Sequence, residues 1–424
     1  MATESLETDI QRKLVMAIKN TTKLIETCLD AKDLRMDDKA FTRERSLGAK
    51  NILHLLLHKI YHSLQLCLDK YFKGIDIIPV SKQAFSQSRK HLNPEYVRKF
   101  VDMTSELAAQ DNTVPNYKGM RLIAIDGSDI ALENTPELKE TFGCSGPKND
   151  AATALCSVAY GPLDQAIYDC RIEHYAADER DLAKEHVKRL SELGLRGSLL
   201  LFDRGYPSAE FVAFLYDSSF QFVIRVRNKF NLDADDMKTQ GMINLKHNDK
   251  EYLVRVLKVK LDNGETETLL TSLNQKQLPI RKAGELYFQR WKVETAYDLL
   301  KSKLELENFS GKTHVSVLQD FYATMYLGNI AAFAAEEADD QISDADKDKD
   351  LKYQRKASRT RTIAKLRDVF LSVITEQDEA KRSTMLDELI SDISRYPIQV
   401  VPNRSPTRKL PRKKRFYIGR RSVV

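Results

Sequence analysis

Four polar side chains recur along one segment, 286–311, at a spacing that would place them on one face of a helix. Tyr287, Arg290, Glu294 and Lys301 stand at offsets 0, 3, 7 and 14. At about 100° per residue, these positions fall within roughly 60° of one another on an α-helix. A carboxylate flanked by a guanidinium and an ammonium suits a site that holds a metal ion and a phosphodiester together. The same spacing also occurs on solvated helix faces that carry ordinary charge pairs.

Two apolar runs upstream, at 122–125 and 199–202, each end on an aspartate that is followed within two residues by a glycine. The aspartates are Asp126 and Asp203, and both runs are predicted to be buried strands. An ionised carboxylate at the end of a buried strand costs several kcal/mol unless it has a cation or hydrogen-bond partners. Either aspartate alone could cap a turn or pair with a neighbouring side chain. Together with Glu294, the two favour a cluster of three acids.

The pattern of apolar residues predicts the elements that must position these acids. Helical spacing dominates the N-terminal quarter, strand-like runs alternate with an amphipathic helix in the middle, and helical spacing returns after a β-rich stretch. These signals predict a helical N-terminal region at 1–115, an α/β domain in two parts at 116–227 and 283–336, a β-rich insertion at 228–282, and an acidic linker followed by a basic helical region at 337–424.

Capping and turn residues support these regions. Ser81 is a candidate N-cap of a short basic helix, and Asp178 is a candidate N-cap of the amphipathic helix. The residues Asp-Asn-Gly at 262–264 lie between two strand-like runs and are a strong hairpin signal. The local signals therefore agree with the division into regions.

Charge is distributed unevenly along the chain. The net charge is +6 at pH 7, yet residues 401–424 contain nine Lys or Arg and no acid, which leaves a net charge of −3 on residues 1–400. This basic tail could follow a phosphate backbone, or it could be a solubilising end. Two short helices with basic faces within 1–115 suit a DNA-binding region, and equally an all-helical scaffold with solvated Lys and Arg.

Composition is that of a soluble globular protein. The chain is 42% hydrophobic and 30% charged, and the uncharged stretch at 321–335 is too short to span a bilayer and predicts a buried helix. The five cysteines never stand as C-x-x-C, so we expect reduced thiols and no zinc site. The N-terminus lacks the basic start and apolar core of a signal peptide, so we expect a cytoplasmic protein with no membrane segment.

The polar stripe resembles the signature of a known family. The set Tyr287-x2-Arg290-x3-Glu294-x6-Lys301 is similar to the motif of DDE transposases from bacterial insertion sequences, in the insertion-sequence-4 group. The resemblance covers most of residues 40–315. The β-rich stretch between the second and third acids also matches that group.

The two upstream aspartates extend the resemblance. Asp126 in IAIDGSD and Asp203 in LLLFDRGY resemble the first and second catalytic aspartates of the group, each in an apolar strand context. The resemblance implies an α/β fold with a ribonuclease-H-like core, a mixed sheet with helices on both faces that brings Asp126, Asp203 and Glu294 together. The β-rich insertion and helical N-terminal and C-terminal regions would surround this core.

The resemblance also implies a chemistry. The three acids would be the catalytic residues and metal ligands, holding two Mg²⁺ (or Mn²⁺) ions across a scissile phosphate. The reaction would be cleavage at transposon ends followed by joining to target DNA, that is, cut-and-paste transposition. Tyr287, Arg290 and Lys301 would contact DNA near the cut. The implied partners are the terminal inverted repeats, the target DNA and a second copy of the chain in a homodimer on DNA.

Two other functions are compatible with parts of this pattern. A related ribonuclease-H-like nuclease would keep the three acids without the Tyr-Arg-Lys stripe. A non-catalytic DNA-binding protein derived from a transposase would gain nothing from three clustered acids. Trp291 is interpreted as a core anchor, and Asp129 and Asp298 as candidates for supporting the acids. His174 and His186 form no recognisable triad with Ser or Cys and are interpreted as structural.

Overall fold

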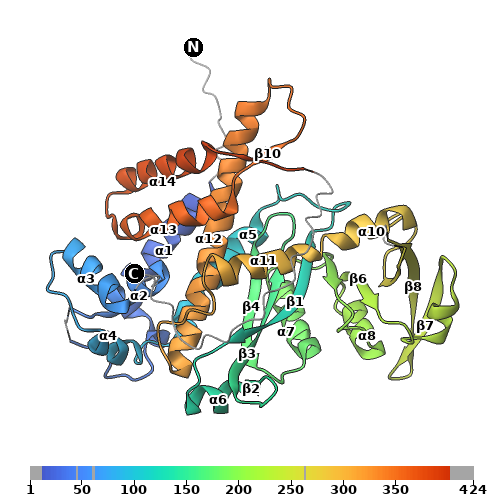
Figure 1. The fold of residues 1–424 in the computed structure, drawn as a ribbon, viewed down its shortest axis with the longest axis horizontal. Helices are drawn as coiled ribbons and strands as arrows, with labels where there is room; N and C mark the ends of the chain where they lie inside the picture. Colours follow the sequence, from blue (N-terminus) through green and yellow to red (C-terminus); the bar gives the residue numbers. More distant parts are fainter. Residues whose placement is uncertain (1–11, 44–45, 60–62, 262–263, 402–424) are drawn as a thin grey trace. The chain divides into compact units, whose positions relative to one another are not determined.

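The computed structural model describes residues 12–43, 46–59, 63–261 and 264–401, and Figure 1 shows their helices and strands. These residues form two compact units. A helical unit takes the chain up to Leu107 and from Asn329 onward, and a sheet unit takes Ala108–Gly328. The basic tail at 402–424 lies outside the described residues.

The helical unit is built from amphipathic helices of the N-terminal and C-terminal parts of the chain. Ser81 caps α4, because its side chain accepts a hydrogen bond from the backbone N–H of Ala84 (3.2 Å). None of the helices in the described ranges combines the length and the apolarity needed to cross a membrane. The elements are α1 (Lys13–Glu26), η1 (Cys28–Asp30), η2 (Lys32–Leu34), α2 (Ala49–His58), α3 (Leu64–Gly74), α4 (Lys82–Arg89), α13 (Arg359–Thr375), α14 (Glu379–Ser394), parts of α5 (Pro94–Gln110) and α12 (His314–Asp346), and the ribbon of β10 (Arg355–Lys356) with β11 (Ile398–Gln399).

Helix α12 continues through part of the stretch that the sequence predicted to be an acidic linker. It ends at Asp346, ten residues into that stretch. Ala338 and Ile342 are buried, so the acidic segment keeps an apolar stripe at helical spacing. Glu337 pairs with Arg12 at 2.7 Å. Burial of the stripe and this ion pair explain why the acidic residues are helical.

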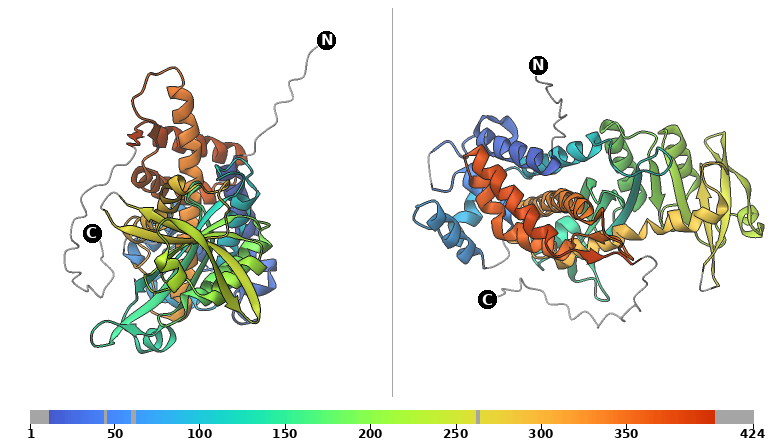
Figure 2. Two further views of the ribbon diagram at one scale, coloured as in Figure 1. Left: turned by 90° about the vertical axis from the view of Figure 1, so that its right-hand side faces the viewer. Right: turned by 90° about the horizontal axis from the view of Figure 1, so that it is seen from above.

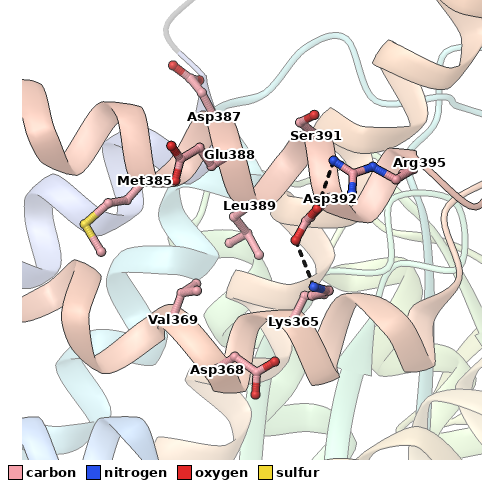
Figure 3. A pocket seen from close by; sticks show the side chains of 10 residues that line it. All are labelled: Lys365, Asp368, Val369, Met385, Asp387, Glu388, Leu389, Ser391, Asp392 and Arg395. Atoms are coloured by element: carbon pink, nitrogen blue, oxygen red, sulfur yellow. Dashed lines mark hydrogen bonds and ion pairs between the residues drawn. The ribbon is translucent and has the colours of Figure 1, made fainter.

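An open pocket of 580 Å³ lies between helices α13 and α14 in the helical unit (Figure 3). Val369 and Leu389 supply apolar lining, and Lys365 pairs with Asp392 at 2.8 Å across the two helices. Arg395 contacts the same aspartate at 3.4 Å. Asp392 therefore connects two basic residues of the wall, one from each side of the pocket.

The sheet unit is organised around a nine-stranded mixed sheet (Figures 1 and 2). Strands β1, β5 and β6 are parallel, β3 runs antiparallel to β1, and β4 runs antiparallel to β3. The order β4-β3-β1-β5-β6 with these directions is that of a ribonuclease-H-like core, so the predicted α/β fold class is confirmed. The core strands are β1 (Leu122–Ala131), β2 (Cys144–Ser145), β3 (Ala151–Tyr160), β4 (Ile167–His174), β5 (Leu199–Phe202) and β6 (Gln221–Val226).

The β-rich stretch extends this same sheet. Strand β9 (Thr266–Thr271) pairs antiparallel with β6 and with β8 (Lys250–Lys260), and β8 pairs with β7 (Gln240–His247). The predicted hairpin is therefore present between β8 and β9, although Asp262 and Asn263 of its turn lie outside the described residues. Helix α9 (Leu232–Asp236) precedes these strands.

Helices cover both faces of the core sheet. Helix α7 (Glu179–Glu192) packs on β1, β3 and β4, and α11 (Trp291–Ser302) packs on β1. Gly127 of β1 lies against Glu179 of α7, whereas Ser128 accepts a hydrogen bond from Lys301 of α11 (2.8 Å). Because successive strand residues face opposite sides, α7 and α11 lie on opposite faces of β1. The remaining helices of the unit are α6 (Pro136–Phe142), α8 (Ala209–Asp217) and α10 (Ile280–Phe288).

Strand β5 should be a main source of stability, because all four of its residues are buried. We expect Leu201→Ala, at a position with no exposed surface, to lower the free energy of unfolding by about 2–5 kcal/mol through lost apolar contact and a residual cavity. The matched control is Leu253→Ala, whose side chain is 61% exposed, and it should change stability by less than about 0.5 kcal/mol. Equal losses in urea denaturation would contradict this account of the core.

Candidate active site

Asp126 and Asp203 lie side by side because of the register of two parallel strands. Strand β1 pairs with β5 up to Ala124 opposite Leu201, so the positions two residues further along each strand are also neighbours. The sequence predicted that the first strand ends at Asp126, but β1 continues to Ala131. It continues because β3 still pairs with it beyond the end of β5. Asp126 therefore stands where one edge of β1 opens.

Glu294 reaches the aspartates from the first turn of α11. The sequence predicted one continuous helix for the segment that carries it, and this is wrong. Helix α10 ends at Phe288 and α11 begins at Trp291, with Arg290 as its N-cap. At the junction, the Arg290 N–H donates to the carbonyl of Tyr287 (3.0 Å), a tighter three-residue bond. The polar stripe is thus divided between two helices.

Arg290 connects two of the three acids. Its Nη1 lies 3.4 Å from Oδ2 of Asp126, and its Nη2 lies 2.7 Å from Oε1 of Glu294. Arg290 is only 4% exposed, and its Nε has no hydrogen-bond partner. The guanidinium also lies over the ring of Trp291, 5.2 Å from the centroid. A buried cation therefore balances the charge of the acids in this conformation.

The acids influence one another electrostatically. Burial raises the pKa of Asp126 to about 7, the charge of Arg290 opposes this shift, and the carboxylates of Asp203, Glu179 and Glu294 add to it. Asp203 also accepts a hydrogen bond from the N–H of Gly205 at 2.6 Å. The site therefore concentrates negative charge that a further cation would relieve.

The remaining residues of the stripe make structural contacts. Tyr287 is buried, and its hydroxyl donates to the carbonyl of Phe202 (3.2 Å), immediately before the second aspartate. Lys301 donates to the hydroxyl of Ser128 (2.8 Å) and to the carbonyl of Asp129 (2.5 Å). Each residue thus connects its helix to the end of β5 or to β1, on which the aspartates depend.

Sequence reasoning missed two residues of this site. Tyr297 is buried three positions after Glu294, and its hydroxyl donates to the carbonyl of Asp126 (2.8 Å). Glu179 approaches the acids from α7 at the point where Gly127 lacks a side chain. The periodicity that selected Glu294 would also have selected Tyr297, whereas no local signal linked Glu179 to the aspartates.

Two expectations for neighbouring residues need revision. Trp291 is 39% exposed, so it is not the buried core anchor that was predicted, because its ring lies beside the guanidinium at the helix junction. Asp298 is exposed on α11. Asp129 supports the site through its backbone carbonyl, which accepts from Lys301.

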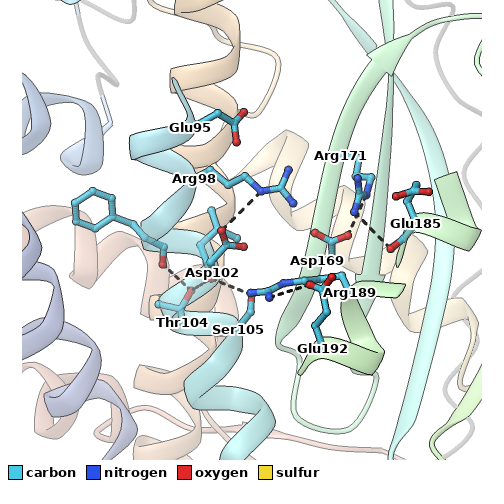
Figure 4. A network of polar contacts seen from close by, with 12 residues as sticks. Glu95, Arg98, Asp102, Thr104, Ser105, Asp169, Arg171, Glu185, Arg189 and Glu192 are labelled. Carbon is cyan, nitrogen blue, oxygen red and sulfur yellow. Dashed lines mark hydrogen bonds and ion pairs between the residues drawn. The ribbon is translucent and has the colours of Figure 1, made fainter. Parts of the chain in front are cut away.

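His186 does take part in a Ser-His-Asp arrangement, contrary to the expectation from sequence. Its Nδ1 lies 2.7 Å from Oδ2 of Asp169, and its Nε2 lies 3.0 Å from the hydroxyl of Ser157. All three residues are buried, so the group has no access for a substrate and its role is structural, as predicted for the histidine. Arg171 also pairs with Asp169 at 3.1 Å and reaches the backbone of Glu185 (Figure 4).

This buried network connects α7 to the strands β3 and β4, beside β1. Ser157 lies opposite Gly127 in the β1–β3 register, and its hydroxyl lies 3.4 Å from the carbonyl of Asp126. His186 therefore connects α7, β4 and β3 at the level of the first aspartate.

We expect His186→Ala to lower the free energy of unfolding by about 2–3 kcal/mol, because it removes the two buried hydrogen bonds that the imidazole makes with Asp169 and Ser157. His91→Ala is the matched control, since that side chain is exposed, and it should cost less than about 0.5 kcal/mol. Thermal and urea denaturation would measure both. A loss no greater than that of the control would show that the network does not hold α7.

Asp126 should make stability depend on pH in the absence of divalent cations. The pKa of Asp126 is about 7 in the folded protein and 3.8 ordinarily. The contribution of Asp126 to the free energy of unfolding is therefore fully present below about pH 4 and is lost as the pH rises through 7. We expect Asp126→Asn to be more stable than the wild type at pH 8 by about 2 kcal/mol, and this difference should shrink towards pH 4. Urea denaturation in EDTA at several pH values measures it. A difference that does not vary with pH would contradict the raised pKa.

The donor set fits a divalent cation, although the side chains are arranged around Arg290. Carboxylate oxygens are the ligands that Mg²⁺ and Mn²⁺ prefer. The guanidinium between Asp126 and Glu294 marks a position that already accommodates positive charge. Within the described ranges, no three His, Cys, Asp or Glu side chains converge closely enough to share one ion in this conformation. Movement of Arg290 would free the acids.

Comparisons with known proteins show what the chain is similar to. Residues 117–327 match the transposase DDE domain family. The chain is 24% identical over 285 residues to the transposase InsG for insertion sequence element IS4 of Escherichia coli (strain K12), an alignment that covers 60% of this chain and 61% of that relative. Among solved structures, the piggyBac transposase synaptic complex with hairpin DNA matches with a TM-score of 0.46 and 13% identity, over 93% of this chain and 85% of that one.

The order and directions of the core strands define a fold of the ribonuclease-H-like class. The DDE domain match over residues 117–327 and the similarity to the IS4 relative both point to the DDE transposases of the insertion-sequence-4 group. This confirms the resemblance noted in the sequence.

Proposed function

We propose that the protein cleaves the ends of a transposon and joins them to target DNA by metal-dependent phosphoryl transfer, in cut-and-paste transposition. The observation that supports this proposal is the register of two parallel strands, which makes Asp126 and Asp203 neighbours, together with the link from Asp126 through Arg290 to Glu294 of α11. These acids would hold two Mg²⁺ or Mn²⁺ ions. When bound, the ions would activate a water or a DNA 3′-hydroxyl and stabilise the departing oxygen.

Arg290 exchanges partners in this proposal. Its guanidinium neutralises Asp126 and Glu294 when no other cation is near. A guanidinium binds phosphate through two parallel hydrogen bonds. Arg290 can therefore leave the acids and bind an incoming phosphodiester, while divalent cations replace it at the carboxylates. The same exchange brings the scissile phosphate beside the carboxylates.

Lys301 and Tyr287 act with Arg290 in different ways. Lys301 lies on the α11 face of β1 and adds positive charge that attracts a phosphate backbone. Tyr287 holds the end of β5, and its direct contact with DNA stays a prediction, since its hydroxyl is bonded to the Phe202 carbonyl in this conformation.

The proposed partners are DNA and a second copy of the chain. The terminal inverted repeats and the target would be the substrates, and a homodimer would hold two ends together in the bacterial cytoplasm. The basic helices of the N-terminal region would supply contacts to the repeats.

Cleavage of a labelled DNA fragment that carries the element's own ends, with Mg²⁺, tests this function. We expect Asp126→Ala, Asp203→Ala and Glu294→Ala each to reduce the cleavage rate by about 10³-fold or more, which corresponds to about 4 kcal/mol of transition-state stabilisation. Binding of the same fragment, measured in parallel, should be retained. Glu285→Ala is the matched control, because Glu285 is an exposed acid on α10 that pairs with Lys282 (2.6 Å), and it should cleave like the wild type.

The outcomes separate the proposed function from other readings. If the wild type binds the ends without cutting them, the protein is a DNA-binding relative of transposases. If the wild type cuts DNA but never joins ends to a target, it is a nuclease with the same acids. Cutting by the three variants at the wild-type rate would remove these acids from the mechanism.

A further inference from the structure

Glu179 occupies an unusual position beside the catalytic strand. It is the first residue of α7, directly after the N-cap Asp178. A Cβ added to Gly127 would lie 3.0 Å from Cδ and 3.1 Å from Oε2 of Glu179. The carboxylate therefore fills the space that a side chain at position 127 would need, which explains why a glycine follows Asp126.

The fold holds Glu179 in this place through His186. The two residues are seven positions apart on α7, so they lie within roughly 20° of one another on the helix. His186 is bonded to Ser157, and Ser157 lies opposite Gly127 on β3. The buried histidine thus sets the rotation of α7 that directs Glu179 over Gly127.

Glu179 belongs to the electrostatic environment of the catalytic acids. Its carboxylate is among the charges that act on Asp126. Partial burial raises the pKa of Glu179, and the charges of Asp203 and Asp129 raise it further. The residue nevertheless keeps exposed surface, so a ligand can reach it.

The hydroxyl of Tyr206 provides a second, independent observation. Tyr206 has no exposed surface, and its ring packs against Phe202 and Phe211. Its hydroxyl interacts with the carboxylate of Glu179, and the charges of Asp126 and Asp203 act on it, but the contact with Glu179 does not reach the geometry of an ordinary hydrogen bond. A buried hydroxyl without a well-formed hydrogen bond is rare, because leaving it unpaired costs about 1–3 kcal/mol. A bound ion with its water molecules beside Glu179 would supply that hydrogen bond.

We propose that Glu179 is a fourth carboxylate of the divalent-cation site, contributed from the α7 face of β1. This inference rests on the proposed function, since it assumes that the acids bind a divalent cation. Asp126 and Glu294 meet α11 on one side of the strand, and Glu179 approaches on the other side through the gap at Gly127. The cation site therefore draws its ligands from both layers of helices.

The competing explanation is that Glu179 only stabilises the helix. Acids in the first turn favour the positive end of the helix dipole, and Asp181 occupies the same turn. Asp181 is 73% exposed in its side chain and pairs with Lys184 at 3.2 Å. It therefore provides a matched control, with the same charge and the same turn but no approach to Gly127.

Binding of Mn²⁺ to the full-length protein without DNA tests the proposal, with isothermal titration calorimetry and the electron paramagnetic resonance of Mn²⁺ as readouts. We expect Glu179→Gln to weaken Mn²⁺ binding by about 10–100-fold, as loss of a metal-site residue generally does. Asp181→Asn should bind Mn²⁺ like the wild type. Circular dichroism and thermal denaturation of both variants verify that α7 is folded.

Gly127→Ala provides a variant that keeps every carboxylate. The new methyl group would meet the flexible end of Glu179, which can move aside, and would lie 3.3 Å from Cδ1 of Leu155, which has to shift by only a few tenths of an ångström. We therefore expect the fold to be retained, as circular dichroism can verify, while the carboxylate leaves its place. We expect Gly127→Ala to weaken Mn²⁺ binding about as much as Glu179→Gln. In the Glu179→Gln background, the alanine should cause little further loss, because both changes remove the same ligand.

The results distinguish this inference from the proposed function. If Asp126→Asn abolishes Mn²⁺ binding while Glu179→Gln and Gly127→Ala bind like the wild type, Glu179 is not a ligand and the inference fails alone. If Asp126→Asn also binds like the wild type, the acids do not hold the cation and the proposed function fails with it. Equal weakening by Glu179→Gln and Asp181→Asn would assign the effect to the general charge of the helix end, against the inference.

Discussion

The mutual repulsion of clustered carboxylates is the constraint on which this structure depends. Asp126 is largely buried and feels three other carboxylates, so the cluster is stable only with a compensating positive charge. Arg290 supplies that charge from within the protein. Arg290 can therefore be displaced, because a cation that binds the acids more favourably than a guanidinium would release Arg290 for an anionic partner.

The architecture brings the acids together through elements that differ in rigidity. Two central strands set the aspartates in register, and buried contacts from both helix layers hold the first strand. Tyr297 donates to the carbonyl of Asp126 from α11, while His186 bonds Ser157 from α7. Buried hydrogen bonds thus hold the strands that carry the charged groups, and the adaptable part of the site is the side chain of Arg290.

The sequence was sufficient for the fold class, and the apolar runs that end on Asp126 and Asp203 are local patterns that direct attention to these two neighbouring positions. It was insufficient where tertiary contacts decide the outcome. Helical periodicity cannot detect the break at Arg290, since the buried interactions of its guanidinium with the acids favour a tighter junction there. The sequence did not predict Glu179 as a site residue, because its position beside the acids depends on Gly127, a glycine on another element. The segment around Ile342 was read as a linker because its acids hide an apolar stripe.

The sheet extension between the second and third acids has a consequence for synthesis on the ribosome. Arg290 and Asp126 are 164 residues apart, and strands β7 to β9 are made between β6 and α11. Strands β1 to β6 can pair as they emerge, but the third acid arrives only after the extension has been translated. A nascent chain therefore holds an incomplete carboxylate set for many seconds, since translation proceeds at about 5–20 residues per second. The proposed set of three acids is therefore completed only after the strands of the sheet have been made.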